Sequence, residues 1–291
     1  MNYIVSLTYH IVSHHSFKMK RYSGLSIRSL FYDFILKKIF DSNKIHEFKG
    51  LKPFSVTPLY RSENDSYYIY QSGDKFIDGY FRIVFLSVKN IHEVIDKLSR
   101  DVDIEIDEEV CKIDNIEYSI VSYNDLIREL KIMDNFIIEF LSPTILRSPS
   151  YYIKLVKENN EFKPIVKTKW RKRGIYLPLP YPQLIFKSII RCFKKFSEIE
   201  NYPYDEINEF VNNDGIMLSG YPNGIKTMAI KVSKKEAYIG FVGKVQFTIN
   251  KTILNMYENV IKYIPQLLKY AEYSNIGGNR LSGFGWVKVK M

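Results

Sequence analysis

The order of strand and helix patterns along this chain restricts its fold more than any other feature. Residues 3–12 alternate with a period of two, which is typical of a half-buried strand. The patterns that follow are a helix, two strands, a second helix and further strand, over residues 25–39, 53–60, 79–88, 91–98 and 102–121. This β-α-β-β-α-β order predicts a ferredoxin-like domain.

Local capping signals agree with both predicted helices. Ser23 stands where its side chain could cap the first helix. Asn90 precedes the second helix, and Glu93 follows three residues later, which is the spacing of a capping box. We therefore predict that the two helices begin at these positions.

The second half of the chain repeats the same order more loosely. A first strand over 136–141 is predicted to end at Ser142-Pro143. A helix is predicted to begin near Pro182, because proline suits the first helical turn. Two strands, a helix that Pro265 should kink, and a last strand complete the order, over residues 225–232, 238–249, 251–273 and 284–290.

These patterns predict an α+β chain with two tandem ferredoxin-like (RRM-like) βαββαβ domains. We place the first domain at residues 1–132 and the second at 133–291. Residues 142–181 are predicted to form a loop insertion in the second domain, and long loops of this kind are usually functional or mobile. The helix that begins near Pro182 has an apolar face and an opposite face that is basic, with Lys187, Arg191, Lys194 and Lys195.

Charge is unevenly distributed along the chain, whose formal net charge is +10. Residues 1–140 hold 18 Lys and Arg against 21 Asp and Glu, whereas residues 141–291 hold 24 against 11. A basic surface attracts polyanions and releases counterions when it binds them. Charge alone leaves RNA, DNA, an anionic membrane and a merely solubilising face as alternatives.

Several other classes of protein are disfavoured by the sequence. The two cysteines, Cys111 and Cys192, are far apart, which argues against a disulfide framework or a cysteine-rich zinc site. No apolar run is long enough to span a membrane, and the first ten residues resemble a strand more than a signal peptide. We expect a soluble cytoplasmic protein with no cofactor. The histidines lack metal-ligand spacing, so we also expect no metal at His10, His14, His15, His46 or His92.

A glycine-rich stretch near the C-terminus is the most specific motif. Four glycines fall within nine residues between a predicted helix and the last strand, at Gly277, Gly278, Gly283 and Gly285. Such a loop, over residues 275–285, lets the backbone approach a phosphate closely. Arg280 lies inside the loop and could hold a phosphate with two parallel hydrogen bonds. It is neither a P-loop nor a dinucleotide-binding fingerprint, because it precedes a strand.

This loop and the duplicated ferredoxin-like plan resemble the CRISPR-associated endoribonucleases of the RAMP superfamily, which cut precursor transcripts at each repeat. Three further segments resemble landmarks of the family, namely Ile138–Thr144, Leu177–Pro180 and Gly240–Gly243. The family's loop usually begins Gly-hydrophobic-Gly, whereas this chain has Asn275-Ile276-Gly277. Asparagine tolerates left-handed backbone geometry, so we expect the turn to be kept.

The resemblance implies a catalytic set of Tyr32, His46 and Lys52. Archaeal members place a tyrosine on the first helix, and a histidine and a lysine in the link that follows it. The residues from His46 to Lys52 match that link as histidine, acid, apolar residue, Lys-Gly, then lysine. His14 and His15, after the first strand, are the alternatives for the catalytic histidine.

The chemistry of RNA cleavage suits these residue types. The 2′-hydroxyl can attack the adjacent phosphate, so neither a metal nor an enzyme nucleophile is required. His46 would act as general acid or base, since histidine titrates near neutrality. Tyr32 would orient the 2′-hydroxyl or share in proton transfer, and Lys52 would stabilise charge on the phosphorane. The expected products carry a 2′,3′-cyclic phosphate and a 5′-hydroxyl.

Two groups of residues are predicted to bind RNA in addition to the glycine loop. Residues 163–174 hold six basic side chains and one tryptophan, which combines phosphate neutralisation with a base-stacking surface. The candidates within that stretch are Lys167, Lys169, Trp170, Arg171, Lys172 and Arg173. Lys18, Lys20 and Arg21 precede the first helix and could grip RNA near the cut.

The leading hypothesis is therefore a metal-independent endoribonuclease that cleaves CRISPR repeat RNA, whether single-stranded or hairpin. The alternative is a non-catalytic RNA-binding subunit of the same superfamily within a CRISPR effector complex. A basic DNA- or RNA-binding regulator is disfavoured, because neither helix-turn-helix nor zinc-finger spacing is visible. The resemblance is compatible with a monomer or a homodimer, with an effector complex as a further partner and with no membrane.

Overall fold

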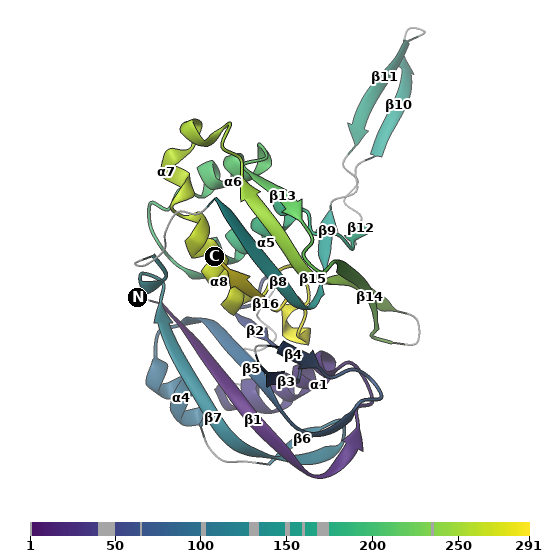
Figure 1. Ribbon diagram of the computed structural model, residues 1–291, viewed down its shortest axis with the longest axis vertical. Helices are drawn as coiled ribbons and strands as arrows, with labels where there is room; N and C mark the ends of the chain where they lie inside the picture. Colours follow the sequence, from purple (N-terminus) through teal and green to yellow (C-terminus); the bar gives the residue numbers. More distant parts are fainter. Residues whose placement is uncertain are drawn as a thin grey trace.

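The computed structural model consists of two α/β units that stack along its longest axis (Figure 1). It describes residues 2–39, 50–64, 66–99, 103–127, 134–148, 152–158, 161–167, 175–233 and 236–291. Two antiparallel sheets organise these units, and the described strands up to Ser122 and from Asn135 onward belong to separate sheets. The predicted boundary at 132/133 lies outside the described residues.

The first sheet is built around a long central strand, β1 (Tyr3–Lys18). Strand β1 lies between β5 (Lys75–Val88) and β7 (Glu109–Ser122), and Leu7 is in register with Ile83 and Tyr118. The sheet order is β4-β3-β5-β1-β7-β6, with β2 also pairing with β5. The shorter strands are β2 (Phe54–Val56), β3 (Tyr60–Glu63), β4 (Ser66–Ile69) and β6 (Ile104–Ile106).

The first helical segment covers one face of this sheet. It comprises α1 (Ser23–Leu30), a π-helical turn (Phe31–Ile35) and α2 (Leu36–Ile39). The capping role predicted for Ser23 is wrong, because Ser23 is the first helical residue and its hydroxyl donates to the Leu59 carbonyl.

The second helix of the first domain, α4 (Ile91–Leu98), begins as the sequence predicts. The Asn90 side chain accepts a hydrogen bond from the Glu93 backbone N–H at 3.4 Å. Asn90 thus satisfies a backbone N–H that the helix itself leaves without a partner.

The second sheet has the order β13-β15-β8-β16, with β14 also pairing with β15. Its long helix α5 (Pro182–Phe196) carries a proline in the first turn, as predicted, and buries its apolar face. The other helices are α6 (Tyr204–Asn212), α7 (Glu258–Ile261) and α8 (Ile264–Ser274). The strands are β8 (Asn135–Thr144), β13 (Ile216–Gly220), β14 (Ile225–Lys231), β15 (Ala237–Ile249) and β16 (Val287–Lys290).

Three expectations about the second domain are wrong. Strand β8 continues through Ser142-Pro143 to Thr144. The segment 142–181 is more than a loop, since β9 (Leu146–Ser148) pairs with β12 (Ile175–Leu177), and β10 (Tyr152–Glu158) pairs with β11 (Glu161–Lys167). The helix expected over 251–273 is divided, because Pro265 lies in the first turn of a separate helix, α8.

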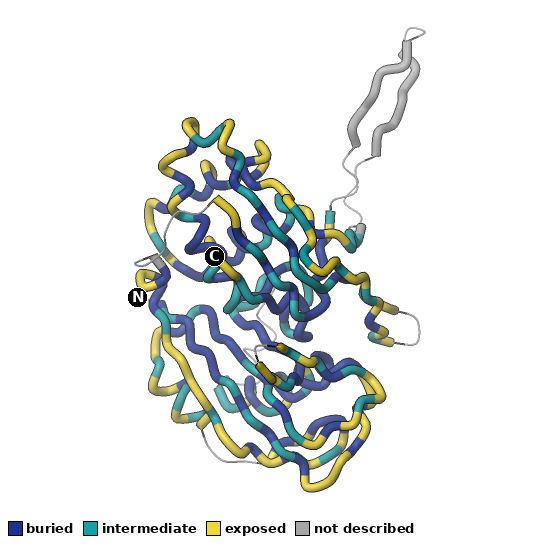
Figure 2. Tube along the Cα trace, in the orientation of Figure 1, coloured by how far each residue is buried: buried dark blue, intermediate teal, exposed yellow. Residues whose placement is uncertain are grey.

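The two units share buried apolar residues, and many residues where the units meet are dark blue in Figure 2. Ile4, Val84 and Leu86 of the first sheet belong to the same core cluster as the second domain. A smaller cluster joins Tyr22 and Leu25 to residues of the second domain. Burial of this kind fixes the two domains against each other. No helix within the described ranges is long and apolar enough to cross a membrane.

Candidate active site between the two domains

Tyr32 and Lys52 lie in direct contact. The Lys52 Nζ donates a hydrogen bond of 2.5 Å to the Tyr32 hydroxyl and lies 4.9 Å from the centre of the ring. Both side chains are partly exposed. Two residues twenty apart in the sequence are thus brought together as the resemblance implied, and an ammonium group is held beside a phenol that can accept or donate a proton.

The π-helical turn positions Tyr32 in this arrangement. Phe31, its neighbour, is buried against Phe54 and Phe85, with ring centres 5.4 and 6.4 Å away. Phe31 faces the core, and Tyr32, one position further around the helix, is half-buried at the edge of the same core. π-turns are uncommon within helices and are often found at functional sites.

Tyr32 and Lys52 open into a cavity of about 670 Å³ between the two domains. Its walls come from α1, from the link before β2, from α5 and from the glycine-rich loop. The lining residues are Arg28, Tyr32, Gly50, Leu51, Lys52, Phe54, Arg191, Lys194, Lys195, Gly277, Gly278, Asn279, Arg280, Leu281 and Ser282. These described lining residues include six cationic side chains and no carboxylate. We call this cavity the cationic pocket.

The composition of the cationic pocket determines which ligands it can attract. Lysine and arginine side chains that converge in a concave site concentrate positive potential and favour a polyanion. Lys52 presents a compact charge, whereas Arg28 and Arg191 offer planar forks that suit phosphate oxygens. The arrangement can therefore bind a phosphate backbone and stabilise additional negative charge on one phosphate.

Four of the cationic side chains in this pocket were not predicted as site residues from the sequence. They are Arg28 of α1 and Arg191, Lys194 and Lys195 of α5. The basic face of α5 is visible as a pattern, and all three of its pocket residues are exposed. Nothing in the sequence indicates that this face lines the same cavity as α1 of the other domain. Arg28 carries no local signal at all, and its guanidinium carbon lies 5.8 Å from the Tyr32 ring.

Three residues of the glycine loop that were expected to contact RNA instead contact the rest of the protein. Gly283 is buried with a φ of 70°, and a Cβ there would lie 2.8 Å from the Pro58 nitrogen. Gly285 is buried with a φ of 74°, and a Cβ would overlap the Ile276 carbonyl. Arg280 is 6% exposed and donates to protein atoms. These residues dock the loop onto the rest of the protein.

The first two loop glycines line the cationic pocket, but their backbone N–H groups are already in use. The Gly277 N–H donates to the Ser188 hydroxyl at 2.8 Å, and the Gly278 N–H donates to the Ile145 carbonyl at 2.9 Å. RNA contact by Gly277 and Gly278 stays a prediction. Such contact would depend on RNA approaching the glycine backbone closely, because the two N–H groups already have protein partners.

Asn275 keeps the turn, as expected, with a φ of 56°. Its side-chain nitrogen also donates to the Val56 carbonyl at 2.9 Å and to the Phe284 carbonyl at 3.2 Å. A glycine could adopt this backbone but could not make these bonds, so asparagine adds a link between the domains.

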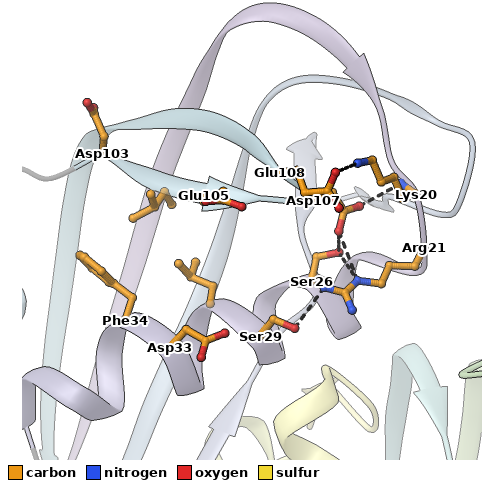
Figure 3. Close-up of a pocket in the computed structure, with 12 residues that line it drawn as sticks. Lys20, Arg21, Ser26, Ser29, Asp33, Phe34, Asp103, Glu105, Asp107 and Glu108 are labelled. Atoms are coloured by element: carbon orange, nitrogen blue, oxygen red, sulfur yellow. Dashed lines mark hydrogen bonds and ion pairs between the residues drawn. The ribbon is translucent and has the colours of Figure 1, made fainter.

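Lys20 and Arg21 line a different cavity, on the other side of α1 (Figure 3). The Lys20 Nζ lies 2.5 Å from a Glu108 carboxylate oxygen, and the Arg21 Nε lies 3.2 Å from Asp107. The hydrogen bond to Glu108 raises the pKa of Lys20. Acids compensate their charges, which weakens the case for RNA contact, and the expected grip on RNA beside the cut stays a prediction for these two residues. Lys18 is exposed at the end of β1 and stays a prediction.

His14 and His15 are poor alternatives for the catalytic histidine. Phe31 packs on Phe85, which is in register with Val5, whereas His14 lies nine residues further along β1. At the spacing of a strand this places His14 roughly 30 Å from the level of Tyr32. Both histidines lie within β1 (Tyr3–Lys18), so the expectation that they follow the first strand is wrong, whereas their place as alternatives to His46 stays a prediction.

Several predicted site residues lie outside the described residues. They are His46 in the link, and Lys169, Trp170, Arg171, Lys172 and Arg173 in the insertion. Lys167 is the last residue of β11. Their roles stay predictions.

The fold defines a class, namely RAMP-type proteins with two tandem ferredoxin-like domains, and the cationic pocket lies between those two domains. The family model of the CRISPR-associated endoribonuclease Cas6 matches residues 138–287, which is just over half of the chain. The chain therefore belongs to the Cas6 family of CRISPR-associated endoribonucleases. No curated protein matches the chain.

Solved structures show the same fold over the whole length. Thermus thermophilus Cas6 has a TM-score of 0.66 at 17% identity, covering 100% of this chain and 99% of that one. The product complex of that Cas6 has a TM-score of 0.70 at 16% identity, covering 99% of each chain. A Cas6-related protein from Pyrococcus furiosus has a TM-score of 0.54 at 11% identity, covering 99% of this chain and 98% of that one.

Proposed function

We propose that this protein cleaves precursor CRISPR RNA within its repeats and so releases guide RNAs. The observation that carries this proposal is the contact between Lys52 and Tyr32 at the wall of the cationic pocket. The family supplies the reaction class, RNA cleavage, and the pocket supplies positive charge for the scissile phosphate. An effector complex is the proposed destination of the guide RNAs.

The cut would proceed by attack of the ribose 2′-hydroxyl on the adjacent phosphate. Lys52 would stabilise the charge that develops on the phosphorane oxygens, and Tyr32 would orient the attacking hydroxyl or relay its proton. The O5′–P bond breaks as the O2′–P bond forms, and the departing 5′-oxygen takes up a proton. The reaction therefore leaves a 2′,3′-cyclic phosphate on one product and a 5′-hydroxyl on the other.

His46 is the proposed general acid or base in this reaction. It precedes Gly50, which lines the cationic pocket, by four positions, so the chain can span at most about 14 Å between them. Histidine exchanges protons readily at neutral pH, which neither lysine nor tyrosine does at its ordinary pKa.

Cleavage is expected to proceed at an unchanged rate in EDTA, because the nucleophile belongs to the RNA and Lys52 supplies the positive charge. The measurement is cutting of a labelled repeat-containing RNA in EDTA and in magnesium, followed by identification of both new ends. A rate that chelation abolishes and magnesium restores would contradict the mechanism. So would a 3′-hydroxyl end.

The basic insertion is proposed to hold RNA outside the pocket. Neutralising Lys167, Lys169, Arg171, Lys172 and Arg173 is expected to weaken RNA binding. It should also lower the slope of log affinity against log salt by about 0.7 for each phosphate of single-stranded RNA that the protein then leaves unneutralised. Affinity would be measured across a salt series, with a variant that neutralises five exposed or partly exposed lysines elsewhere, Lys75, Lys97, Lys112, Lys251 and Lys262, as the matched control. An unchanged slope would show that the insertion does not touch RNA.

A further inference from the structure

The link that carries Lys52 belongs to the first domain, yet the second domain holds its backbone. The Lys195 ammonium on α5 donates to the Leu51 carbonyl at 2.7 Å. The Arg280 guanidinium in the glycine-rich loop donates to the Lys52 carbonyl at 2.9 Å. Two consecutive carbonyls at the catalytic lysine are therefore held by cations from two elements of the other domain.

Attachment continues along the following strand, β2. The Ser55 hydroxyl donates to the carbonyl of Tyr273, at the end of α8. The Asn275 side chain donates to the Val56 carbonyl. The position of Lys52 relative to Tyr32, which lies in the π-helical turn after α1, is consequently set across the domain interface.

The burial of Arg280 indicates that its contact with the Lys52 carbonyl carries a desolvation free-energy cost. Its side chain is 6% exposed, and within the described part of the chain its hydrogen-bond partners are the Lys52 and Ser274 carbonyls and the Cys192 sulfur. Burying a guanidinium beside other cations and without a carboxylate is unfavourable. The Ser274 carbonyl ends helix α8, so the negative end of the helix dipole offsets part of this cost.

Packing alone would not require a charge at position 280. An apolar side chain of similar volume would avoid the desolvation penalty, and buried ion pairs can often be replaced in that way without loss of stability. Arginine adds a planar fork that reaches two carbonyls on different elements in one fixed geometry. One of those carbonyls belongs to the residue that contacts Tyr32.

We propose that Arg280 and Lys195 are positioning residues, which fix the backbone at Leu51 and Lys52 so that the Lys52 ammonium points at the scissile phosphate. This inference rests on the proposed function, because it assumes that Lys52 takes part in cleavage. Catalysis then depends on the docking of the second domain, and the site is complete only when the glycine-rich loop is seated. A displacement of about 1 Å at a catalytic group can cost up to about 100-fold in rate.

The test is a set of double-mutant cycles on the full-length protein. Lys195→Ala, Lys195→Arg and Arg280→Lys would each be made with Lys52 intact and with Lys52→Ala. Single-turnover cleavage at saturating protein and the RNA dissociation constant would be measured for every variant. Lys195 is exposed, so its variants keep the test valid even where Arg280→Lys does not fold.

With Lys52 intact, Lys195→Ala is expected to lower the saturating rate about tenfold, and Arg280→Lys by up to about 100-fold. Lys195→Arg should recover most of the rate because it keeps a donor. In the Lys52→Ala protein neither change should lower the rate further, since a positioning residue acts only through the group it positions.

Equal losses in both backgrounds would overturn the positioning role, because a folding or binding defect persists without Lys52. Variants that cleave slowly at low protein concentration but at the normal rate at saturating protein would overturn it too. That result would assign both residues to RNA binding. Failure of the proposed function has a different signature. The unaltered protein would then leave the repeat RNA uncut, whereas a Lys52→Ala protein that cleaves at the normal rate would remove only the premise that Lys52 takes part in cleavage.

Discussion

Lys52→Ala is expected to lower the rate of cleavage at saturating RNA by about 100- to 1,000-fold, with a much smaller loss of RNA affinity. Removing one preorganised donor that stabilises charge in a transition state usually has an effect of this size. Affinity should change little, because four exposed cationic side chains, Arg28, Arg191, Lys194 and Lys195, line the same pocket. The loss should therefore appear in the rate of the bound complex.

Single-turnover cleavage and equilibrium binding, measured on the same RNA, separate these two quantities. Lys262→Ala is a matched control, since Lys262 is an exposed lysine 5.3 Å from the ring of Tyr263 and does not line the cationic pocket. It should leave both quantities unchanged. A Lys52→Ala protein that binds weakly but cuts at the normal rate once saturated would assign Lys52 to binding alone.

His46→Ala is expected to slow cleavage by about 100- to 10,000-fold while RNA binding stays nearly intact. General acid or base catalysis by a positioned histidine contributes within that range. The measurement is again the single-turnover rate, now over a series of pH values. The protein without His46 should lose the part of the pH profile that titrates near neutrality.

His14→Ala and His15→Ala are the controls for this prediction. Both side chains are exposed on β1, and the His15 ring lies 3.1 Å from the Glu109 carboxylate. Neither change should affect the rate, because β1 carries them about 30 Å from the level of Tyr32. Normal turnover by His46→Ala combined with a loss in either control would transfer the catalytic role.

The fold was largely predictable because its signals are local. The alternation of β1 follows from one buried face of the sheet, and the apolar face of α5 follows from the helical repeat. Pro182 and Asn90 mark helix starts through their own chemistry. The divided helix before the glycine loop was missed, because the position of Pro265 fits both a kink and a helix start.

The site was predictable only in part. The contact between Tyr32 and Lys52 followed from the family resemblance and could not have followed from composition. The role of Arg280 could not be foreseen, because a basic residue in a glycine-rich loop looks the same whether it faces a phosphate or the interior. Its partners are far away in sequence, at Lys52 and Cys192, and only the docked domains bring them together.

The most direct test of the central claim is to offer the purified protein a repeat-containing RNA and the same RNA with a single 2′-deoxy nucleotide at the cut. The proposed mechanism predicts one cut in the RNA, none in the 2′-deoxy analogue, and equal binding of both, because only the attacking hydroxyl is missing. Cutting of both the RNA and its 2′-deoxy analogue would show that the 2′-hydroxyl is not the nucleophile. Binding without cutting, over several different repeats, would contradict the enzyme and favour a structural RNA-binding subunit.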